Sequence, residues 1–209
     1  MRGMNMWIRC AYILLGLVLL VTFNARAEGN HVSRERVVFK KNKVLIVYLS
    51  RTQNTKAVAD MIQRYTKGDL VSIELVKPYP SNYRKTVEQV KQENESNYLP
   101  ELKTRIENIE QYDTVFIGFP TWGMQLPPPM KSFLSSYSLS NKTVIPFNTN
   151  AGYGIGSSFA QVIQLCERCN VRQGISFVGG IERDGKLLEI KQQRAKDVET
   201  EVVKWLGSL

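Results

Sequence analysis

The sequence predicts an α/β fold, with a doubly wound five-stranded parallel sheet between two helical layers. From residue 43 onward, short apolar runs alternate with segments of helical periodicity, as in βαβ units. The runs at 44–49 and 114–119 are almost wholly apolar, which is typical of strands buried on both faces. Unusual polar and aromatic loops follow the strands, at the edge where such sheets bind ligands.

Five segments have the length and composition of strands. The segment 70–75 alternates apolar and polar residues, so we expect it to be half exposed, whereas the others are more continuously apolar. The predicted strands are residues 43–49, 70–75, 114–119, 143–147 and 175–178.

Helical patterns fill the intervals between the strands. In the first helix Val58, Met61 and Ile62 share one face, as a helix packed on a sheet requires. Ser81 is a plausible N-cap for the second helix, and the prolines of the fourth stand at its start, where a helix tolerates them. The predicted helices are residues 55–65, 82–95, 102–109, 127–137, 155–167 and 189–206.

The N-terminal part of the chain resembles a targeting segment. Arg2 and Arg9 give a basic start, residues 11–23 are apolar or weakly polar, and Ala25-Arg26-Ala27 offers a cleavage site. The apolar run is shorter than the about 20 residues of a membrane span. We therefore expect a signal peptide over 1–27, a polar leader over 28–42 and one domain over 43–209, with export to the periplasm. The alternative is an uncleaved anchor, which would attach the protein to a membrane only through this segment.

Charge and composition limit the partners. The chain of 209 residues has a formal net charge of +9, which falls to +6 without residues 1–27. No basic block is interleaved with aromatic residues, so we expect no nucleic-acid partner. A mildly basic surface would favour an acidic partner.

Two cysteines, Cys166 and Cys169, follow the predicted signal peptide in the pattern Cys-Glu-Arg-Cys. In an exported protein they could form a disulfide. A redox-active pair is the alternative, although a position near the end of a helix lacks the dipole that lowers a thiol pKa. His31 is the single histidine, and we therefore predict no metal site.

The loop Ser50-Arg51-Thr52-Gln53-Asn54-Thr55 joins a predicted buried strand to a predicted helix. Free N–H groups at a helix N-terminus and hydroxyl donors bind phosphate, and no acid in the loop would repel it. The loop lacks the glycine patterns of nucleoside triphosphatases and of dinucleotide-binding folds. The alternative is a plain helix cap by Ser50 or Thr52.

The segment 119–127, Phe-Pro-Thr-Trp-Gly-Met-Gln-Leu-Pro, follows another strand. Its Trp122 either folds back on the domain or covers a flat aromatic ligand. The segment 148–157 follows the next strand and carries glycines at alternate positions, which permits close backbone approach to a ligand. The alternative for 148–157 is a flexible turn before a helix.

Together the three loops describe a site for a phosphorylated aromatic cofactor, and here the chain resembles the bacterial flavodoxin-like family. The resemblance extends from about Lys43 to Leu206. The segments that carry it are Tyr48-Leu49-Ser50-Arg51-Thr52-Gln53-Asn54-Thr55, Pro78-Tyr79-Pro80-Ser81-Asn82-Tyr83, Gly118-Phe119-Pro120-Thr121-Trp122, Lys142-Thr143-Val144-Ile145-Pro146-Phe147 and the glycine-rich loop.

The resemblance implies the strand order 2-1-3-4-5 and FMN at the strand ends. Ser50, Thr52, Asn54 and Thr55 would hold the phosphate together with the backbone N–H groups of 51–55, which include Arg51 and Gln53. The flavin ring would lie between two further sets of residues. One set is Pro120, Thr121, Trp122 and Gly123, and the other, which also approaches the pyrimidine edge, is Asn148, Thr149, Asn150, Ala151, Gly152, Tyr153 and Gly154.

The chain departs from its relatives at two places. They often have a second tryptophan at the position of Gly123 and a Cys-Thr-His-Gly-Gly type sequence at 148–152. Gly123 would open one flavin face, and the missing histidine removes a group that handles protons.

The resemblance implies an electron carrier that holds FMN and has no catalytic residue of its own, with a redox protein or a small acceptor as partner. The alternative is an FMN-dependent NAD(P)H:quinone-type oxidoreductase, which would need a pocket beside the flavin. A third hypothesis is a binding module that has lost its cofactor.

Overall fold

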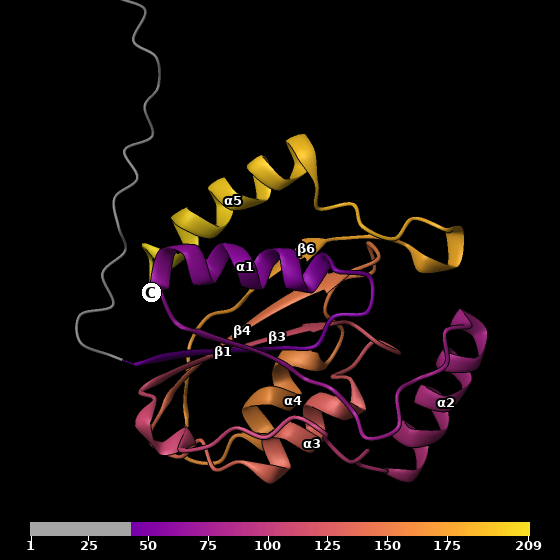
Figure 1. Ribbon diagram of the computed structural model, residues 1–209, viewed down its shortest axis with the longest axis horizontal. Coiled ribbons are helices and arrows are strands. Elements are labelled where there is room, and N and C mark those ends of the chain that lie inside the picture. Colours follow the sequence, from indigo (N-terminus) through magenta and orange to yellow (C-terminus); the bar gives the residue numbers. More distant parts are fainter. Residues whose placement is uncertain (1–42) are drawn as a thin grey trace, which may run out of the picture. The chain divides into compact units, whose positions relative to one another are not determined.

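The computed structural model describes residues 43–209, so the predicted signal peptide and leader lie outside the described residues. Strands and helices alternate along this part of the chain, except that β5 and β6 follow each other without a helix between them (Figure 1). The strands are β1 (Val44–Tyr48), β2 (Asp69–Ser72), β3 (Thr114–Pro120), β4 (Thr143–Asn150), β5 (Asn170–Val171) and β6 (Ile175–Val178).

Five of the six predicted helices are present, with ends that differ from the prediction by up to three residues. They are α1 (Asn54–Thr66), α2 (Tyr83–Ser96), α3 (Pro128–Ser136), α4 (Ser158–Leu165) and α5 (Gln192–Leu206). Two single turns of 3₁₀ helix, Ile109–Gln111 and Glu182–Asp184, complete the described secondary structure.

The sheet is parallel throughout, with the order β2-β1-β3-β4-β5. This confirms the doubly wound fold and the strand order that the resemblance implied. The fifth position of the sheet is divided between two short strands. β5 pairs with the first residues of β4, and β6 pairs with Phe147–Asn150 at its end.

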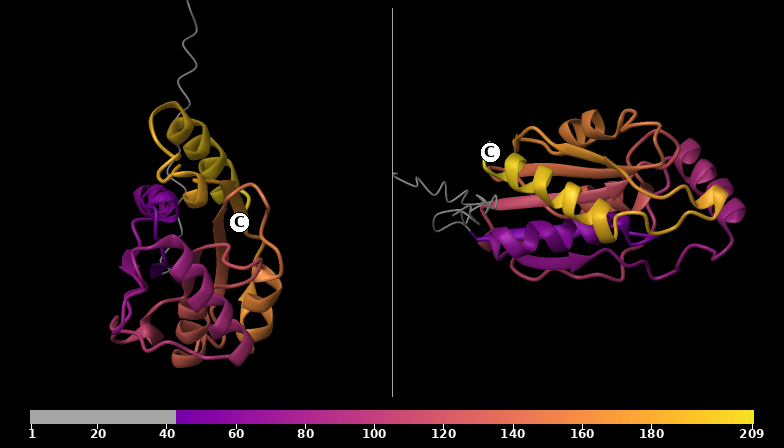
Figure 2. Two further views of the ribbon diagram at one scale, coloured as in Figure 1. Left: turned by 90° about the vertical axis from the view of Figure 1, so that its right-hand side faces the viewer. Right: turned by 90° about the horizontal axis from the view of Figure 1, so that it is seen from above.

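Both faces of the sheet are buried, as the continuous apolar runs predict. Helices α1 and α5 cover one face and α3 and α4 the other (Figures 1 and 2). Along β1 the side chains alternate between two cores: Leu45 and Val47 pack on the α3 and α4 side, and Val44 and Ile46 on the α1 and α5 side. This packing fixes β1 in place and brings its carboxyl end to the edge of the sheet.

The predicted helix over 102–109 is wrong. Leu102 instead forms an antiparallel bridge with Leu75, and the N–H of Lys103 donates to the carbonyl of Glu74 at 2.8 Å. The apolar spacing of Leu102, Ile106 and Ile109 imitates a helical face. Leu102 and Ile106 pack on the core from a non-helical segment, and Ile109 packs on it from the first residue of the short 3₁₀ turn. Pairing with the chain that leaves β2 satisfies backbone groups that a helix would otherwise satisfy internally.

Cys166 and Cys169 form a disulfide at the end of α4. Within residues 43–209 no cluster of histidine, cysteine and acidic residues is suited to hold a metal ion. The same part of the chain contains no helix with the length and hydropathy needed to cross a membrane.

Candidate functional site

A cavity of about 500 Å³ opens at the carboxyl ends of the strands. It is bounded by the loops that follow β1, β3, β4 and β6 and, on its outer side, by α2. Seen from the strand ends, α2 crosses the front of the domain (Figure 2). A cavity of this size is typical of sites for small molecules and cofactors.

The loop after β1 presents free backbone donors to this cavity. Gln53 takes a left-handed conformation, with φ of 67°, directly before the helical Asn54. Successive residues of opposite handedness turn their N–H groups toward a common point, which forms an anion-binding concavity. None of the backbone N–H groups of residues 51–55 donates to another described residue, and the first turn of α1 contains no acid.

Several side chains of this loop support its shape. Ser50 Oγ accepts a hydrogen bond from the Lys56 N–H at 3.2 Å. The buried Asn54 amide donates to Thr52 Oγ1 and to the Leu187 carbonyl, and its oxygen accepts from the N–H groups of Glu189 and Ile190. Asn54 therefore fastens the loop to the segment before α5, while the Thr52 hydroxyl keeps its own proton to donate.

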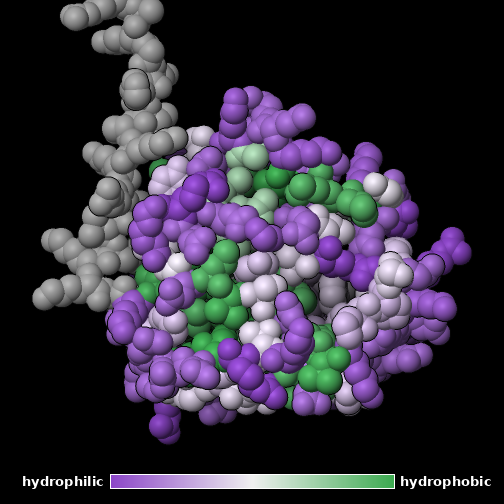
Figure 3. Space-filling model, viewed as in Figure 1, coloured by the Kyte–Doolittle hydropathy of each residue, from purple (hydrophilic) through white to green (hydrophobic). Residues whose placement is uncertain are grey.

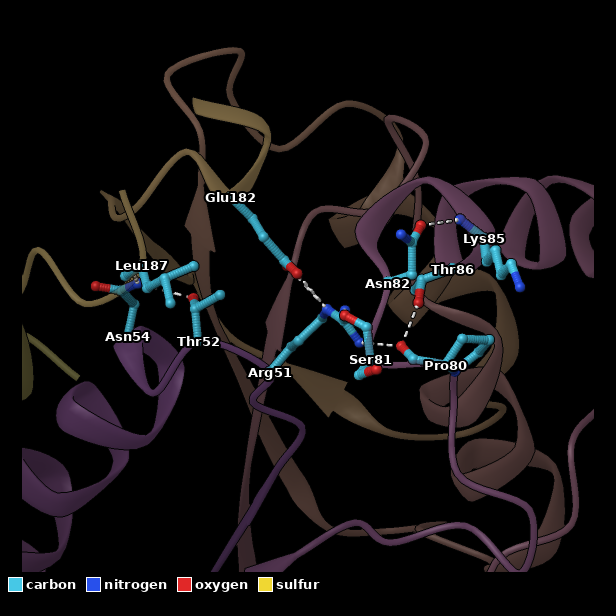
Figure 4. A network of polar contacts seen from close by, with 10 residues as sticks. All are labelled: Arg51, Thr52, Asn54, Pro80, Ser81, Asn82, Lys85, Thr86, Glu182 and Leu187. Carbon is cyan, nitrogen blue, oxygen red and sulfur yellow. Dashed lines mark hydrogen bonds and ion pairs between the residues drawn. The ribbon is translucent and has the colours of Figure 1, made fainter. Parts of the chain in front are cut away.

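Arg51 connects three segments around the cavity (Figure 4). Its Nε lies 2.8 Å from both carboxylate oxygens of Glu182, and its terminal nitrogens donate to the carbonyls of Pro80 and Ser81. Both side chains of the ion pair are only 19% exposed. The guanidinium thus neutralises an acid that lines the cavity beside the phosphate loop.

The loop after β3 is a tight turn. Trp122 and Gln125 exchange two backbone hydrogen bonds, and the residues between them, Gly123 and Met124, have φ of 57° and 58°, as in a type I′ turn. The rings of Trp122 and Tyr79 pack nearly perpendicular to each other, with ring centroids 5.3 Å apart. The Tyr79 hydroxyl donates to the buried Glu93. Burial, reinforced by this hydrogen bond, raises the pKa of Tyr79 far above its ordinary range.

Hydrogen bonds within the loop after β4 hold its conformation. Asn150 Oδ1 accepts from the N–H groups of Gly152 and Gly154 at 2.8 and 3.1 Å. The N–H groups of Ala151 and Tyr153 donate to no described residue, and both residues line the cavity. This loop can therefore offer two backbone donors to a ligand.

Gly156 lets the two loops touch each other. A β-carbon on this residue would lie 2.0 Å from the Met124 carbonyl oxygen, and the following N–H, that of Ser157, donates to the same oxygen at 2.9 Å. A side chain at position 156 would push the loop after β3 away from the loop after β4. The third of the alternate glycines therefore serves loop packing.

Most of the predicted cofactor-binding residues meet in the cavity. Those that line it are Arg51, Thr52, Asn54, Thr55, Pro120, Thr121, Trp122, Gly123, Thr149, Asn150, Ala151 and Tyr153. Those that do not are Ser50, Gln53, Asn148, Gly152 and Gly154. Asn148 is fully buried and donates to the Phe119 carbonyl and to Thr121 Oγ1, so its side chain serves to connect β4 to the loop after β3.

The sequence reasoning missed two walls of the cavity. The first is the face of α2 that carries Tyr83, Thr86, Val87, Val90, Lys91, Asn94 and Glu95. The second is the loop after β6, with Gly179, Gly180, Ile181, Glu182 and Arg183. The Gly179-Gly180 pair directly after a predicted strand was a signal that could have identified the second wall.

On the face shown in Figure 3, apolar residues reach the surface in separate patches between hydrophilic ones. A permanent protein interface usually presents a larger continuous apolar area.

A parallel doubly wound sheet with a phosphate-type loop and aromatic walls at its carboxyl edge defines a nucleotide- or cofactor-binding α/β protein. The chain belongs to the flavodoxin family, whose model, described as Flavodoxin, matches residues 43–194. No curated protein matches the chain.

Solved structures agree with this assignment. A protein assigned as a flavoprotein from Bacteroides eggerthii DSM 20697 is 28% identical, covers 80% of this chain and 97% of its own, and gives a TM-score of 0.64. A similar protein from Bacteroides uniformis ATCC 8492 is 24% identical over 80% of this chain and 99% of its own, also with a TM-score of 0.64. A flavoprotein from Lactobacillus acidophilus NCFM, solved in complex with FMN, is 23% identical over 65% of this chain and 93% of its own, with a TM-score of 0.60.

Proposed function

We propose that this protein binds FMN without a covalent bond and transfers electrons. The observation that carries the proposal is that none of the five N–H groups of residues 51–55, at the N-terminus of α1, donates to another described residue. A phosphate monoester fits such donors, because the helix dipole and the N–H groups stabilise its negative charge together. FMN is also the ligand of the Lactobacillus acidophilus flavoprotein of the same fold.

The remaining walls fit the rest of the cofactor. Trp122 supplies an aromatic surface that a flavin ring can pack against. The free N–H groups of Ala151 and Tyr153 can donate to the carbonyl oxygens of its pyrimidine edge. Thr52 has a hydroxyl proton available for the phosphate, since its oxygen already accepts from Asn54.

Bound FMN would supply the redox chemistry, and the protein would supply binding, orientation and exclusion of water. The Arg51–Glu182 pair keeps a free carboxylate away from the phosphate. The hydrogen bonds of Asn54 hold the loop in one conformation before the ligand arrives, which lowers the entropic cost of binding.

A second candidate, an FMN-dependent NAD(P)H:quinone-type oxidoreductase, is favoured by the extension of the cavity along α2. A carrier needs only an exposed flavin edge, whereas a reductase needs room for a second molecule. Steady oxidation of NAD(P)H in the presence of a quinone by the FMN-loaded protein would support this candidate. Its absence would leave the electron carrier.

We also propose that the protein is exported to the periplasm and meets an acidic redox partner there. Support comes from the signal-like pattern of residues 1–27, from the charge of +6 that remains without them and from the Cys166–Cys169 disulfide, since disulfides persist in oxidising compartments. Fractionation of cells that express the full chain tests the compartment. Recovery of the uncleaved protein in the cytoplasm would contradict export.

The absorbance spectrum of the purified protein tests FMN binding. A yellow protein with flavin absorbance supports the proposal and excludes a module that has lost its cofactor.

Thr52→Glu and Thr55→Glu each place a carboxylate against the phosphate and should abolish the colour. Thr52 is the better position for this test because Thr55 is buried. The control is Thr200→Glu on the exposed side of α5, which adds the same charge away from the cavity and should leave the flavin bound. A Thr52→Glu variant that retains FMN would refute the phosphate assignment.

A further inference from the structure

The wall of the cavity beside Gly123 contains two side-chain amides whose orientation is fixed. Lys131, on α3, donates at 2.8 Å to Asn94 Oδ1 on α2 and at 2.8 Å to Gln125 Oε1 in the loop after β3. An ammonium group has only donors, so both amides must turn their oxygens toward it. The usual ambiguity between amide oxygen and nitrogen is therefore resolved at both residues.

The consequence is a pair of NH₂ groups with free hydrogens. Neither Asn94 Nδ2 nor Gln125 Nε2 donates to another described residue, and both residues line the cavity. A β-carbon on Gly123 would lie 3.7 Å from Asn94 Nδ2, with nothing else within 4 Å. The absence of a side chain at position 123 thus leaves the Asn94 donor accessible.

Lys131 itself has no carboxylate partner among the described residues. It is half-buried, and burial lowers its pKa. A cation that is desolvated without an ion pair costs free energy, so the burial of Lys131 requires a functional reason. The orientation of two donors at the wall of a binding cavity provides that reason.

The rest of this wall is mixed, with apolar Val87 and Val90 beside polar Thr86, Lys91 and Glu95. Val87 and Val90 lie on the face of α2 that lines the cavity, between Tyr83 and Asn94. Tyr83 begins the helix just after the carbonyls that Arg51 contacts, and Asn94 lies beside Gly123. Along the helix axis, Tyr83 and Asn94 are about 16 Å apart. The phosphate donors therefore occupy one end of the cavity and the amide donors the other.

We propose that the Asn94 and Gln125 amides, oriented by Lys131, bind a carbonyl oxygen of a planar quinone at the α2 wall, beside the flavin. This inference rests on the proposed FMN binding and assigns the residues that would hold the quinone acceptor of the second candidate function. The N–H groups of Ala151 and Tyr153, which donate to no described residue, are the proposed donors to the pyrimidine carbonyls of the flavin, and the amide pair would then serve a second molecule. Valine side chains pack against the flat ring, and NH₂ groups match the polar oxygens at its edge.

Equilibrium binding of anthraquinone-2-sulfonate to the oxidised, FMN-loaded protein tests the proposal without any turnover. Calorimetry gives its Kd, and a separate titration gives the Kd for FMN. Asn94→Asp and Gln125→Glu keep the size of each side chain and give Lys131 a carboxylate partner, so the fold should persist. Each replaces the NH₂ donor by an acceptor and should weaken quinone binding at least tenfold, with the FMN Kd unchanged within twofold.

Gln92→Glu is the matched control, because it makes the same amide-to-acid change on the exposed side of α2, away from the residues that line the cavity. It should leave both affinities unchanged. Lys131→Gln, which releases the two amides, should weaken quinone binding and leave FMN binding intact.

Two outcomes would overturn the proposal: no quinone binding by the FMN-loaded wild-type protein, or a loss of FMN affinity in Asn94→Asp with quinone binding unchanged. The second outcome would assign the amides to the flavin itself. A wild-type protein that does not bind FMN would instead contradict the proposed function, and the FMN titration distinguishes that case.

Discussion

Arg51 shows how a charged residue near a binding site can act by neutralising another charged residue. A basic residue in a phosphate loop is easily read as a phosphate ligand, but the guanidinium already has three partners, namely Glu182 and the carbonyls of Pro80 and Ser81. Its contribution to an anionic ligand is then largely neutralisation of Glu182 within the cavity wall.

This role predicts a specific pattern in a double-mutant cycle. Arg51→Gln should weaken FMN binding about tenfold, or about 1.4 kcal/mol, because Glu182 would face the phosphate without a counter-ion. Glu182→Gln alone should have a smaller effect, and the double variant should bind more tightly than Arg51→Gln. Fluorescence titration of FMN measures all four affinities. If Arg51→Gln and the double variant bind equally weakly, Arg51 acts directly on the phosphate.

Tyr112 gives a prediction about alkaline pH. Burial, together with a hydrogen bond to Asp69 of 2.7 Å, raises the pKa of Tyr112 to about 12. An unfolded tyrosine has a pKa near 10, so the folded state holds its proton more firmly. The resulting stability is fully present below pH 10 and is lost as the pH rises from 10 to 12.

Urea unfolding at pH 9, 10 and 11 checks this expectation. The free energy of unfolding should decline above pH 10 in the wild type and decline less steeply in Tyr112→Phe. Tyr98→Phe, at an exposed tyrosine, is the control and should follow the wild type. Parallel curves for wild type and Tyr112→Phe would show that this hydroxyl is not the source of the pH dependence.

Residue types and their position after strands predicted the three loops of the cavity lining that follow β1, β3 and β4, but they did not predict the role of each side chain. Asn54 lines the cavity as expected, yet its amide is used by Leu187, Glu189 and Ile190. Those partners are more than 130 positions away in the sequence, and no local pattern points to them. A polar side chain in a phosphate loop looks the same whether it contacts a ligand or another loop.

At the scale of elements, the strands were the best predicted because burial on both faces leaves a continuous apolar run. The division of the fifth strand was missed, since Asn170–Val171 is too short to give a pattern. The cavity face of α2 was missed for a different reason. Val87 is 48% exposed, and a sequence cannot distinguish a valine that lines a cavity from one that faces open solvent.

The disulfide allows a test at this scale. Cys166 and Cys169 close a loop at the end of α4, just before β5. The chain-entropy model gives so short a loop about 2 kcal/mol of stabilisation. The double variant Cys166→Ser/Cys169→Ser should lose that amount or less in urea unfolding, and its FMN affinity should change less than twofold, because β5 begins at the end of the sheet opposite the cavity. A large loss of FMN binding would contradict this separation of stability and site.

At the scale of the whole molecule, sheet order places four strand-end loops on one edge although they are spread from residue 50 to residue 183. The fold class, once predicted, was therefore enough to indicate where the site lies. Helix α2 closes that edge from outside, and this position depends on contacts such as Arg51 with the Pro80 carbonyl, which the sequence does not reveal. The cavity is a product of the fold as a whole, and its chemistry comes from the individual loops.

The central claim is that the loop at residues 51–55 binds the phosphate of FMN. The most direct test compares the affinity of the FMN-free protein for FMN and for riboflavin, which differ only in that phosphate. The account predicts that FMN binds at least a hundredfold more tightly, equivalent to about 2.7 kcal/mol, and that Thr52→Glu removes this preference while riboflavin binding persists. Equal affinities of the wild-type protein for FMN and riboflavin would contradict the account.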